Sequence, residues 1–508
     1  MKKLIIARRC SQILFLLLFV YILWSTTYPL RGLLSADISF KINPLVMIFT
    51  SISERIVLPG LIFAISMLAL TLVLGRFFCG WVCPMGSVID GIGALNKKKI
   101  ILKDSANKKI SLVKFVILGI ILLFSLFGIQ IAWIFDPVVT IARFVSLNLI
   151  PSLTFAIDKL FVIAIQRFEL YGAFHDFYRG LKESILGVNI YYFANSVAIF
   201  IFFMVIVSFA ILISRLWCRM FCPLGALYAF FGRFSLLRRV ANECTYCGMC
   251  KDHCRTGAIK DSMKYRKGEC VLCMDCVYDC IQNKTKFSFR REVNLLKKKS
   301  DDKNGISRRS FLFLMLSSVF FLGARGRSSR IGFRRKGRSD IIRPPGALKE
   351  EEFLDRCIRC GNCMKVCITN GLQPVMFEAG LSGIWTPQLV PEIGYCEYNC
   401  TLCMEVCPTG ALQRLTLEEK KKYKLGLAKV NKLTCLAWSQ KLECLVCEEH
   451  CPVSQKAIKL EEEWVKDRIL IKKPYVDKNL CIGCGICQNK CPVRPMRAIR
   501  VYPEKKRS

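Results

Sequence analysis

Twenty-nine cysteines dominate the chemistry that this sequence of 508 residues can carry. Four runs share the spacing Cys-x-x-Cys-x-x-Cys-x-x-x-Cys, and they are Cys244, Cys247, Cys250 and Cys254; Cys270, Cys273, Cys276 and Cys280; Cys357, Cys360, Cys363 and Cys367; and Cys481, Cys484, Cys487 and Cys491. Three thiolates at steps of three residues on a tight loop fit three corners of a [4Fe–4S] cubane, and the fourth cysteine commonly ligates a neighbouring cluster. Each run is therefore predicted to bind iron and sulfide.

Two further runs are variants in which the first cysteine is displaced, in one case by one residue and in the other by six. They are Cys396, Cys400, Cys403 and Cys407, and Cys435, Cys444, Cys447 and Cys451. Structural zinc is the alternative, but zinc prefers two separated Cys-x-x-Cys knuckles around one tetrahedral ion. We therefore predict six [4Fe–4S] clusters. Proline follows the fourth cysteine in three runs, whereas Arg255, Ile281 and Ile368 take that place in the others.

Neighbouring runs are expected to exchange their fourth cysteine in the first pair, as in two-cluster ferredoxins. Cys280 would complete the set of Cys244, Cys247 and Cys250, and Cys254 would complete the set of Cys270, Cys273 and Cys276. Among the later runs, the insertion between Cys435 and Cys444 leaves more than one pairing open.

Two Cys-x-x-x-Cys-Pro motifs form a different kind of site. Each follows an apolar segment, and their cysteines are Cys79 and Cys83 in the first copy and Cys218 and Cys222 in the second. Cysteines four residues apart share one face of a helix, so the two pairs together could hold a metal ion or a further iron–sulfur cluster at the cytoplasmic edge of a bilayer. Unligated buried cysteines or a packing motif at the helix end are the alternatives. Cys10 stands alone and is predicted to be inert.

Four apolar segments in the first half are each about as long as the roughly 20 residues that a helix needs to cross a bilayer. They lie near residues 11–30, 56–78, 111–135 and 192–216. Lysine and arginine crowd the amino terminus and the connection after the second segment, and the positive-inside rule therefore puts both in the cytoplasm. Because the second and fourth segments end in matching motifs, the spans are predicted to be a duplicated pair.

The predicted fold class is a membrane α-helical bundle of four spans, with or without a fifth short anchor, joined to α+β ferredoxin-like [4Fe–4S] modules. The expected domains are a membrane domain at 1–240 with both Cys-x-x-x-Cys-Pro motifs, a two-cluster ferredoxin domain at 241–290, a basic linker at 291–339 and a four-cluster polyferredoxin domain at 340–508. The last boundary is marked by Pro344-Pro345-Gly346.

The linker contains an apolar run over 311–323, shortly after Arg308 and Arg309. Such a run is short for a spanning helix and has the length of a signal segment. A route that exports folded, cluster-loaded domains avoids exposing bare thiols to an oxidising compartment. We therefore expect a multi-pass protein of the bacterial cytoplasmic membrane, with 340–508 in the periplasm and 241–290 in the cytoplasm. The alternative is a buried or interfacial helix in the linker and a cytoplasmic module after it.

The formal net charge of +37 does not indicate a nucleic-acid partner in a chain that is 53% hydrophobic. Much of the excess lies beside membrane segments, and each [4Fe–4S] core on four thiolates adds about −2. The histidines are His175, His253 and His450, and no Cys-x-x-Cys-His motif occurs, so haem is not expected. The membrane is an expected partner, and the family resemblance given below implies the quinone pool and other redox proteins, such as a cytochrome or a reductase subunit, as further partners.

Two polar pairs on the predicted outer side, Asp136-Pro137 and His175-Asp176, are weaker candidates. A quinone site could use such groups as proton acceptors. A solvated helix cap is the more ordinary role for an acid directly after a span. No acid–base or nucleophilic constellation is visible, so no catalytic residue is predicted.

The chain resembles two known families joined end to end. Residues 1–290 resemble the NapH family through the four spans, the two Cys-x-x-x-Cys-Pro motifs and the first pair of cluster runs. Residues 305–500 resemble the NapG/MauM family of exported polyferredoxins, through Arg308-Arg309, Phe311-Leu312, Arg343-Pro344-Pro345-Gly346-Ala347-Leu348 and Glu352-Phe353-Leu354-Asp355-Arg356-Cys357-Ile358-Arg359-Cys360-Gly361-Asn362-Cys363. The connection over 137–191 is longer than the membrane module of this resemblance requires.

The resemblance implies a menaquinol or ubiquinol dehydrogenase subunit of a respiratory chain. The leading hypothesis is an iron–sulfur protein that passes electrons from quinol or a cytoplasmic donor to a periplasmic acceptor. The alternative is an accessory or maturation factor that supplies electrons for the assembly or activation of a partner metalloenzyme. A redox sensor is the third hypothesis, although six clusters exceed what sensing needs.

The six cysteine quartets predict that protein purified without oxygen contains roughly 24 iron atoms and 24 sulfides per chain, plus whatever the Cys-x-x-x-Cys-Pro motifs bind. Iron and acid-labile sulfide assays on the same sample measure both numbers. Zinc as the dominant metal would contradict the interpretation.

Overall fold

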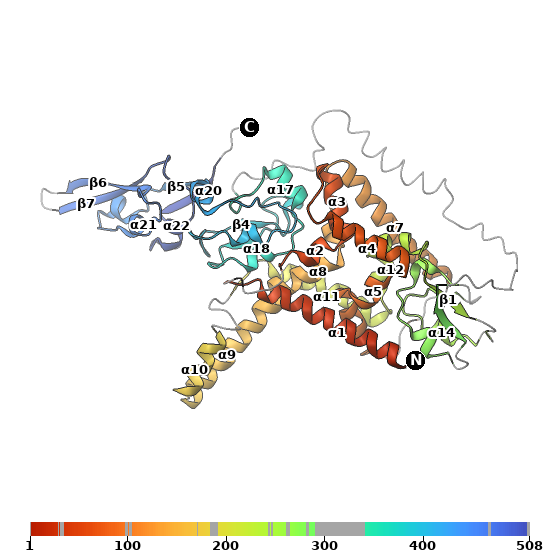
Figure 1. Ribbon diagram of the computed structural model, residues 1–508. Coiled ribbons are helices and arrows are strands. Elements are labelled where there is room, and N and C mark those ends of the chain that lie inside the picture. The colour runs from red at the N-terminus through yellow and green to blue at the C-terminus, as the bar shows by residue number, and fades with distance from the viewer. Residues whose placement is uncertain are drawn as a thin grey trace. The chain divides into compact units, whose positions relative to one another are not determined.

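The computed structural model describes residues 2–28, 30, 35–96, 100, 104–169, 171–182, 191–241, 244, 247–260, 265–280, 284–289, 341–465 and 469–504 (Figure 1). The chain divides into two compact units. The first comprises 1–19, 41–138 and 204–335, and the second comprises 20–40, 139–203 and 336–508. The boundary cuts through four helices, α1 (Lys2–Ser25), α2 (Ile38–Lys41), α8 (Pro137–Phe144) and α11 (Ser196–Leu212).

Helices form the larger part of the first unit. They are α3 (Pro44–Glu54), α4 (Leu61–Leu74), α5 (Phe77–Trp81), α6 (Pro84–Gly93), α7 (Asp104–Leu126), η1 (Ala132–Ile134), α12 (Leu216–Met220) and α13 (Pro223–Gly232). Helix α3 packs on α4 and α7, and α13 packs on the same two helices. Asn43 starts α3, because its side chain accepts a hydrogen bond from the Leu45 amide at 3.1 Å.

Several of these helices present apolar side chains outward. On α4, Ile62, Phe63 and Ile65 are 71%, 53% and 54% exposed. An apolar surface of this kind is unusual on a monomeric protein in water and is the normal state of a helix that faces lipid.

A small α+β region completes the first unit around the runs Cys244–Cys254 and Cys270–Cys280. Its elements are β1 (Arg238–Ala241), α14 (Met249–Asp252), η4 (Lys267–Glu269), α15 (Asp275–Tyr278) and β2 (Thr285–Ser288). The strands before and after the two runs pair antiparallel, with Arg238 opposite Ser288. This pairing closes the region, which we call the first ferredoxin pair.

The second unit contains a long run of consecutive helices. Helix α8 continues through one π-helical turn, η2 (Val145–Leu149), into α9 (Ile150–Phe168), and α10 (Ala173–Leu181) folds back on α9. Ile165 and Tyr178 form the small core between α9 and α10. A π-helical turn shifts the side chains that follow it around the helix axis, and such turns are frequent at functional sites.

Short elements around four cysteine runs form the rest of the second unit, which we call the carboxyl-terminal module. They are α17 (Glu350–Arg356), α18 (Asn362–Lys365), β3 (Leu372–Pro374), η5 (Leu381–Gly383), β4 (Pro387–Leu389), α19 (Leu402–Glu405), α20 (Leu417–Lys422), β5 (Gly426–Val430), η6 (Leu436–Gln440), α21 (Val446–Glu449), β6 (Ile458–Val465), β7 (Ile469–Val476), α22 (Ile486–Lys490) and β8 (Ile499–Pro503). Strand β3 pairs with β4, β5 with β8 and β6 with β7, all antiparallel.

The same closure repeats in the carboxyl-terminal module. Segments before and after the runs of Cys357 and Cys396 join where Ala347 bridges Leu412, and β5 and β8 enclose the last two runs. The ferredoxin-like part of the predicted fold class therefore recurs three times among the described residues.

The long apolar helices of the structure differ from the four spans that the sequence predicts. Within the described ranges, three helices are long and apolar enough to cross a membrane: Lys3–Ser25, Asp104–Leu126 and Pro137–Phe168. The first two overlap the segments predicted near 11–30 and 111–135. The segments near 56–78 and 192–216 contain the shorter α4 and α11, of 14 and 17 residues.

The third long helix, Pro137–Phe168, was not predicted. It lies in the connection that is longer than the resemblance requires. The sequence pattern concealed it because Asp136-Pro137 looks like the end of a span, and Pro151, Asp158 and Lys159 interrupt the apolar residues that follow.

Candidate functional site

The two Cys-x-x-x-Cys-Pro motifs fold alike, as two short helices joined by a break. Val82 ends α5, Cys83 is the N-cap of α6, and Pro84 is the first residue of that helix. In the second copy, Cys222 is the N-cap of α13 and its sulfur accepts from the Gly225 amide at 3.2 Å. Proline suits a first helical turn because its missing amide hydrogen has no partner there. The two cysteines of a motif therefore lie on successive helices, and not on one continuous helix as expected.

The two motifs converge through a pair of exchanged arginines. Arg215, which precedes the second motif, donates to the carbonyl of Cys79 in the first motif at 2.9 Å. Arg76, which precedes the first motif, lies against the second, where a Cβ on Gly225 would come within 2.8 Å of its guanidinium. Both arginines are fully buried. The internal repeat thus brings the two helix ends together.

The four cysteines of these motifs, which we call the membrane-edge cysteines, are buried close to one another. Burial raises the pKa of Cys222, and the charges of Cys218, Cys79 and Cys83 act in the same direction. Such coupling requires the four thiols to be neighbours. A cationic core shared among them would relieve both the burial and the mutual repulsion of the thiolates, so the chemistry of the donor set fits an iron–sulfur cluster.

The first ferredoxin pair sits directly on the membrane-edge cysteines. The indole nitrogen of Trp81 donates to the carbonyl of Leu272 at 3.0 Å. A Cβ on Gly80 would lie 1.9 Å from the carbonyl oxygen of Val271, so only glycine allows the two backbones to approach so closely. Because Gly80 follows Cys79 and Val271 follows Cys270, the cysteine sets of the helix ends and of the ferredoxin pair are joined by direct backbone packing.

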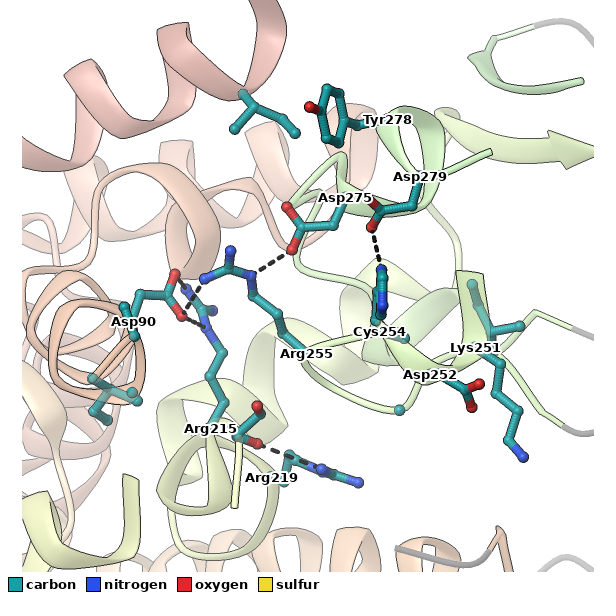
Figure 2. A pocket seen from close by; sticks show the side chains of 18 of the residues that line it. Asp90, Arg215, Arg219, Lys251, Asp252, Cys254, Arg255, Asp275, Tyr278 and Asp279 are labelled. Carbon is teal, nitrogen blue, oxygen red and sulfur yellow. Dashed lines mark hydrogen bonds and ion pairs between the residues drawn. The ribbon is translucent and has the colours of Figure 1, made fainter. Parts of the chain in front are cut away.

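Buried ion pairs hold the ferredoxin pair in this position, as Figure 2 shows for part of the network. Asp90 on α6 binds Arg215 at 2.7 Å and Arg255 at 3.3 Å, and Arg255 also binds Asp275. Arg8 on α1 lies 3.7 Å from Asp90 and 3.8 Å from Asp275. Arg255, which stands where other runs have proline, is therefore the residue that links the first run of the ferredoxin pair to the helices.

A cavity of about 840 Å³ opens beside this network. Charged and polar side chains such as Arg219 and Lys251 form most of its lining (Figure 2). Ile5 and Ile89 contribute apolar side chains from α1 and α6, and the cluster-run cysteine Cys254 also lines the cavity. The cavity therefore joins apolar helix ends to a cysteine of the ferredoxin pair.

Cys254 shares a second, smaller cavity with Cys270, Cys273 and Cys276, and we call these four the Cys254 group. Burial raises the pKa of Cys276 to about 12, and the charges of Cys270 and Cys254 contribute. This grouping is the one that ligand exchange requires. In the other run, Cys244 and Cys247 contribute to the raised pKa of Cys250, after burial.

The first two runs of the carboxyl-terminal module also have their fourth cysteines grouped with the neighbouring run, as ligand exchange would require. One cavity is lined by Cys357, Cys360, Cys363 and Cys407, the Cys357 group, and another by Cys367, Cys396, Cys400 and Cys403, the Cys396 group. Burial raises the pKa of Cys396 to about 11, whereas the ammonium of Lys420 opposes the rise.

In the last two runs, too, the fourth cysteine lies with the neighbouring run, which favours exchange among the pairings that the insertion left open. Cys451, Cys481, Cys484 and Cys487, the Cys481 group, line one cavity. Burial raises the pKa of Cys447 to about 12, with further contributions from Cys435, Cys444 and Cys491. We call Cys435, Cys444, Cys447 and Cys491 the Cys435 group. Among the described residues, no three Cys, His, Asp or Glu side chains have the arrangement that a single metal ion needs.

The weaker candidates occupy other places. Asp136 is buried and starts α8, since its carboxylate accepts from the Val138 amide at 2.9 Å and from the Asn43 side chain at 2.8 Å. His175 and Asp176 are exposed on α10. Cys10 is exposed on α1. The twin arginines and the apolar run over 311–323 lie outside the described residues.

Sequence reasoning missed the contacts between the carboxyl-terminal module and the helices of its own unit. Arg143 on α8 donates to the carbonyl of Arg359 at 2.7 Å, and Lys365 donates to the carbonyls of Leu23 and Trp24 at the end of α1. A lysine at a helix carboxyl end is favourable, because it satisfies free carbonyls and opposes the helix dipole. Arg143, a cation within an apolar run, is the signal that could have revealed the contact.

Comparisons with known proteins identify iron–sulfur domains in both halves. A family model described as a 4Fe-4S binding domain matches residues 56–103 and 196–241, and a model described as a 4Fe-4S dicluster domain matches 356–411 and 442–494. No solved structure matches the chain.

Several curated proteins are similar to part of the chain. The methylamine utilization ferredoxin-type protein MauM of Methylorubrum extorquens is 37% identical over 172 residues, which cover 33% of this chain and 75% of that protein. The ferredoxin-type protein NapG of Escherichia coli is 38% identical over 169 residues, which cover 32% of this chain and 70% of that protein. An uncharacterized protein of Methanocaldococcus jannaschii is 25% identical over 301 residues, which cover 57% and 98% of the two chains.

The contact at Gly80 yields a test of the docking. The Gly80→Ala change places a methyl group against the Val271 carbonyl, so we expect the docking of the ferredoxin pair to weaken by about 1–3 kcal/mol, as in overpacked interiors. Faster amide hydrogen exchange over 265–280 would report it. Gly91→Ala on α6 is the matched control, because nothing lies within 4 Å of its Cβ position. Equal exchange in both variants would contradict the contact.

Proposed function

We propose that this chain conducts electrons between a membrane and a periplasmic acceptor. The chain belongs to the family of the ferredoxin-type proteins MauM and NapG, and the proposal rests on that membership. Membership in this iron–sulfur electron-transfer family follows from the identity to MauM and NapG over more than two thirds of their length. The direction, the donor and the membrane topology are our proposal.

We assign a [4Fe–4S] cluster to each of six cysteine groups. Five are the groups defined above by Cys254, Cys357, Cys396, Cys435 and Cys481. The sixth is Cys244, Cys247, Cys250 and, by exchange, Cys280. When bound, these clusters supply one-electron transfer, with potentials that the surrounding burial and hydrogen bonds adjust. The dicluster family model covers every assigned residue of the carboxyl-terminal module except Cys435.

The membrane-edge cysteines are proposed to hold one further iron–sulfur cluster. Both of their motifs lie inside the two stretches that match the model of a 4Fe-4S binding domain. The observation that carries the proposed function is a pair of contacts. The Val271 carbonyl packs closely against Gly80, and the Leu272 carbonyl accepts a hydrogen bond from Trp81. It puts the membrane-edge site next to the Cys254 group, without intervening protein layers.

The electron donor is proposed to be quinol. Oxidation of a quinol releases two electrons and two protons, and a site for its headgroup must adjoin both apolar helices and a redox centre. The cavity beside Cys254 adjoins apolar side chains at Ile5 and Ile89 and a cysteine that we assign to a cluster, which supports this choice, although charged and polar side chains form most of its lining. A cytoplasmic donor protein would also reach Cys254, so the choice of quinol depends on the resemblance of 1–290 to NapH.

The carboxyl-terminal module is proposed to lie on the periplasmic side. It contacts the carboxyl end of α1 through Lys365. That end lies outside the cytoplasm if the basic amino terminus of α1 lies inside, as the positive-inside rule indicates. This topology follows if α1, α4, α7 and α11 are the four spans and 311–323 is a short anchor, so that the helix over 137–168 is not counted as a span.

The membrane-edge site provides a test of the electron route. In anaerobic detergent, menadiol should reduce the clusters of the unmodified protein. Cys222→Ser should slow the reduction of the carboxyl-terminal clusters by about 10- to 100-fold, a loss that changes near metal sites commonly cause, while dithionite still reduces them. The clusters of the ferredoxin pair, beside which quinol is proposed to bind, should be reduced as before. Visible absorbance follows both reactions. Cys10→Ser, on an exposed cysteine, should react like the unmodified protein. Full menadiol activity in Cys222→Ser would show that electrons bypass the site.

Export of the carboxyl-terminal module can be tested with a reporter fused after Ser508. Alkaline phosphatase activity, which needs the periplasm, should be high in the unmodified fusion. It should fall to background when Arg308→Lys and Arg309→Lys are combined, because the twin-arginine route reads that pair. Activity confined to a cytoplasmic reporter in the unmodified chain would instead place the module inside the cell.

A further inference from the structure

The order of the four cysteine groups in the carboxyl-terminal module can be followed through their contacts. The Cys357 group lies against the helices of its own unit. A Cβ on Gly361 would come 3.1 Å from the Leu147 side chain in the π-helical turn, and Asn362 donates to the carbonyl of Ala36 at 3.4 Å. Arg143 contacts the same cysteine loop through the Arg359 carbonyl. This group therefore lies at the end of the module that contacts these helices, an end that it shares with Asn370 and Gln373, which follow Cys367 and donate to the Tyr192 carbonyl before α11.

The Cys396 group comes next, because exchange ties it to the Cys357 group. Each of the two runs gives its fourth cysteine, Cys367 or Cys407, to the other group. Helices α18 and α19, which carry the two runs, pack on each other. No polypeptide layer separates two groups that share ligand loops in this way.

The Cys396 group is joined in turn to the Cys481 group. The Cys396 amide donates to the Cys484 carbonyl at 2.8 Å. Ile482 and Ile486, beside Cys484, pack against Tyr395. The charge of Cys396 also contributes to the raised pKa of Cys484, after burial.

The Cys435 group is the last in the series. It exchanges Cys491 and Cys451 with the Cys481 group, and α21 packs on α22. None of the contacts described for the residues of this group leads to the apolar helices. Cys435 and Cys444 are separated by the insertion, which η6 anchors by a hydrogen bond of 2.9 Å from Trp438 to the Pro474 carbonyl.

The surface around the Cys435 group combines apolar and basic side chains with the exposed acids Glu443 and Glu449. Leu433 is 87% exposed and Leu442 is 52% exposed. Each follows an exposed lysine, Lys432 or Lys441, so two Lys-Leu pairs frame the insertion. Exposed apolar residues with charged neighbours are the usual composition of a site for a transient protein partner.

We propose that the four groups act as one ordered relay that ends at the Cys435 group, and that a soluble one-electron carrier with an acidic face docks on the two Lys-Leu pairs. The inference rests on the proposed function and adds to it the place where electrons leave and the charge of the partner. The lysines complement an acidic rim, and the leucines supply the apolar contact that brings the partner's redox centre close.

Two redox probes of opposite charge test the docking site. The full chain, prereduced with dithionite, is mixed with plastocyanin, which is acidic, or with mitochondrial cytochrome c, which is basic. Lys432→Glu combined with Lys441→Glu should slow electron transfer to plastocyanin several-fold and speed transfer to cytochrome c by a similar factor, with both effects reduced by salt. Because dithionite supplies the electrons, the result does not depend on quinol oxidation.

Binding gives a readout besides electron transfer. Zinc-substituted plastocyanin is redox-inert, and an NMR titration should show about tenfold weaker binding to the double variant. Lys441→Glu alone, which leaves the contact between Lys432 and Trp438 intact, should weaken binding partly.

Lys422→Glu is the matched control, since Lys422 is exposed on α20, whose Lys420 contacts the Cys396 group. It should leave rates and binding unchanged. Unchanged rates and binding in the lysine variants, or an equal effect of Lys422→Glu, would overturn the assignment of the exit to the Cys435 group.

Discussion

Glu269 is the buried carboxylate on which the joining of helices and ferredoxin pair depends. It is held by Lys114 at 2.5 Å and by Arg76 at 3.2 Å, and all three side chains are buried. Burial alone would raise the pKa of Glu269, but these two cations hold it below its usual range. Removing one partner of such a pair leaves an uncompensated buried charge, at a cost of about 3–5 kcal/mol. Since Glu269 directly precedes Cys270, the same interaction fixes the cysteine loop over the membrane-edge site.

The internal repeat makes the two Cys-x-x-x-Cys-Pro motifs nearly symmetric. The surface that they form binds a single ferredoxin pair, however, so the two motifs must differ where they contact it. The two motifs differ at the residue after their first cysteine, which is Gly80 in one and Arg219 in the other. Gly80 admits the Val271 carbonyl, whereas Arg219 reaches out to the side chain of Asn107. The Asn107 amide in turn donates to the Gly257 carbonyl of the ferredoxin pair at 2.9 Å. One copy thus provides close backbone contact and the other a polar brace.

The cysteine runs were predictable because their chemistry is local, and the predicted NapG/MauM membership is confirmed. Apolar length was a weaker guide: it indicated α1 and α7, but it missed the helix over 137–168, in which Arg143 and Asp158 have tertiary partners. Asp158, for example, pairs with Lys182 of the following segment. The exchanged arginines and the docking of Lys365 could not be predicted, since they join residues far apart in sequence.

The positive charge of the chain has a structural reason beyond membrane orientation. A [4Fe–4S] core on four thiolates carries about −2, and such a charge in a protein interior needs compensation. Arg359 and Lys420 are buried beside the Cys357 and Cys396 groups, as Arg215 is beside the membrane-edge cysteines. Each cation also favours an added electron on its neighbouring site, so the buried arginines and lysines that allow the cysteines to gather also set how readily electrons enter each site.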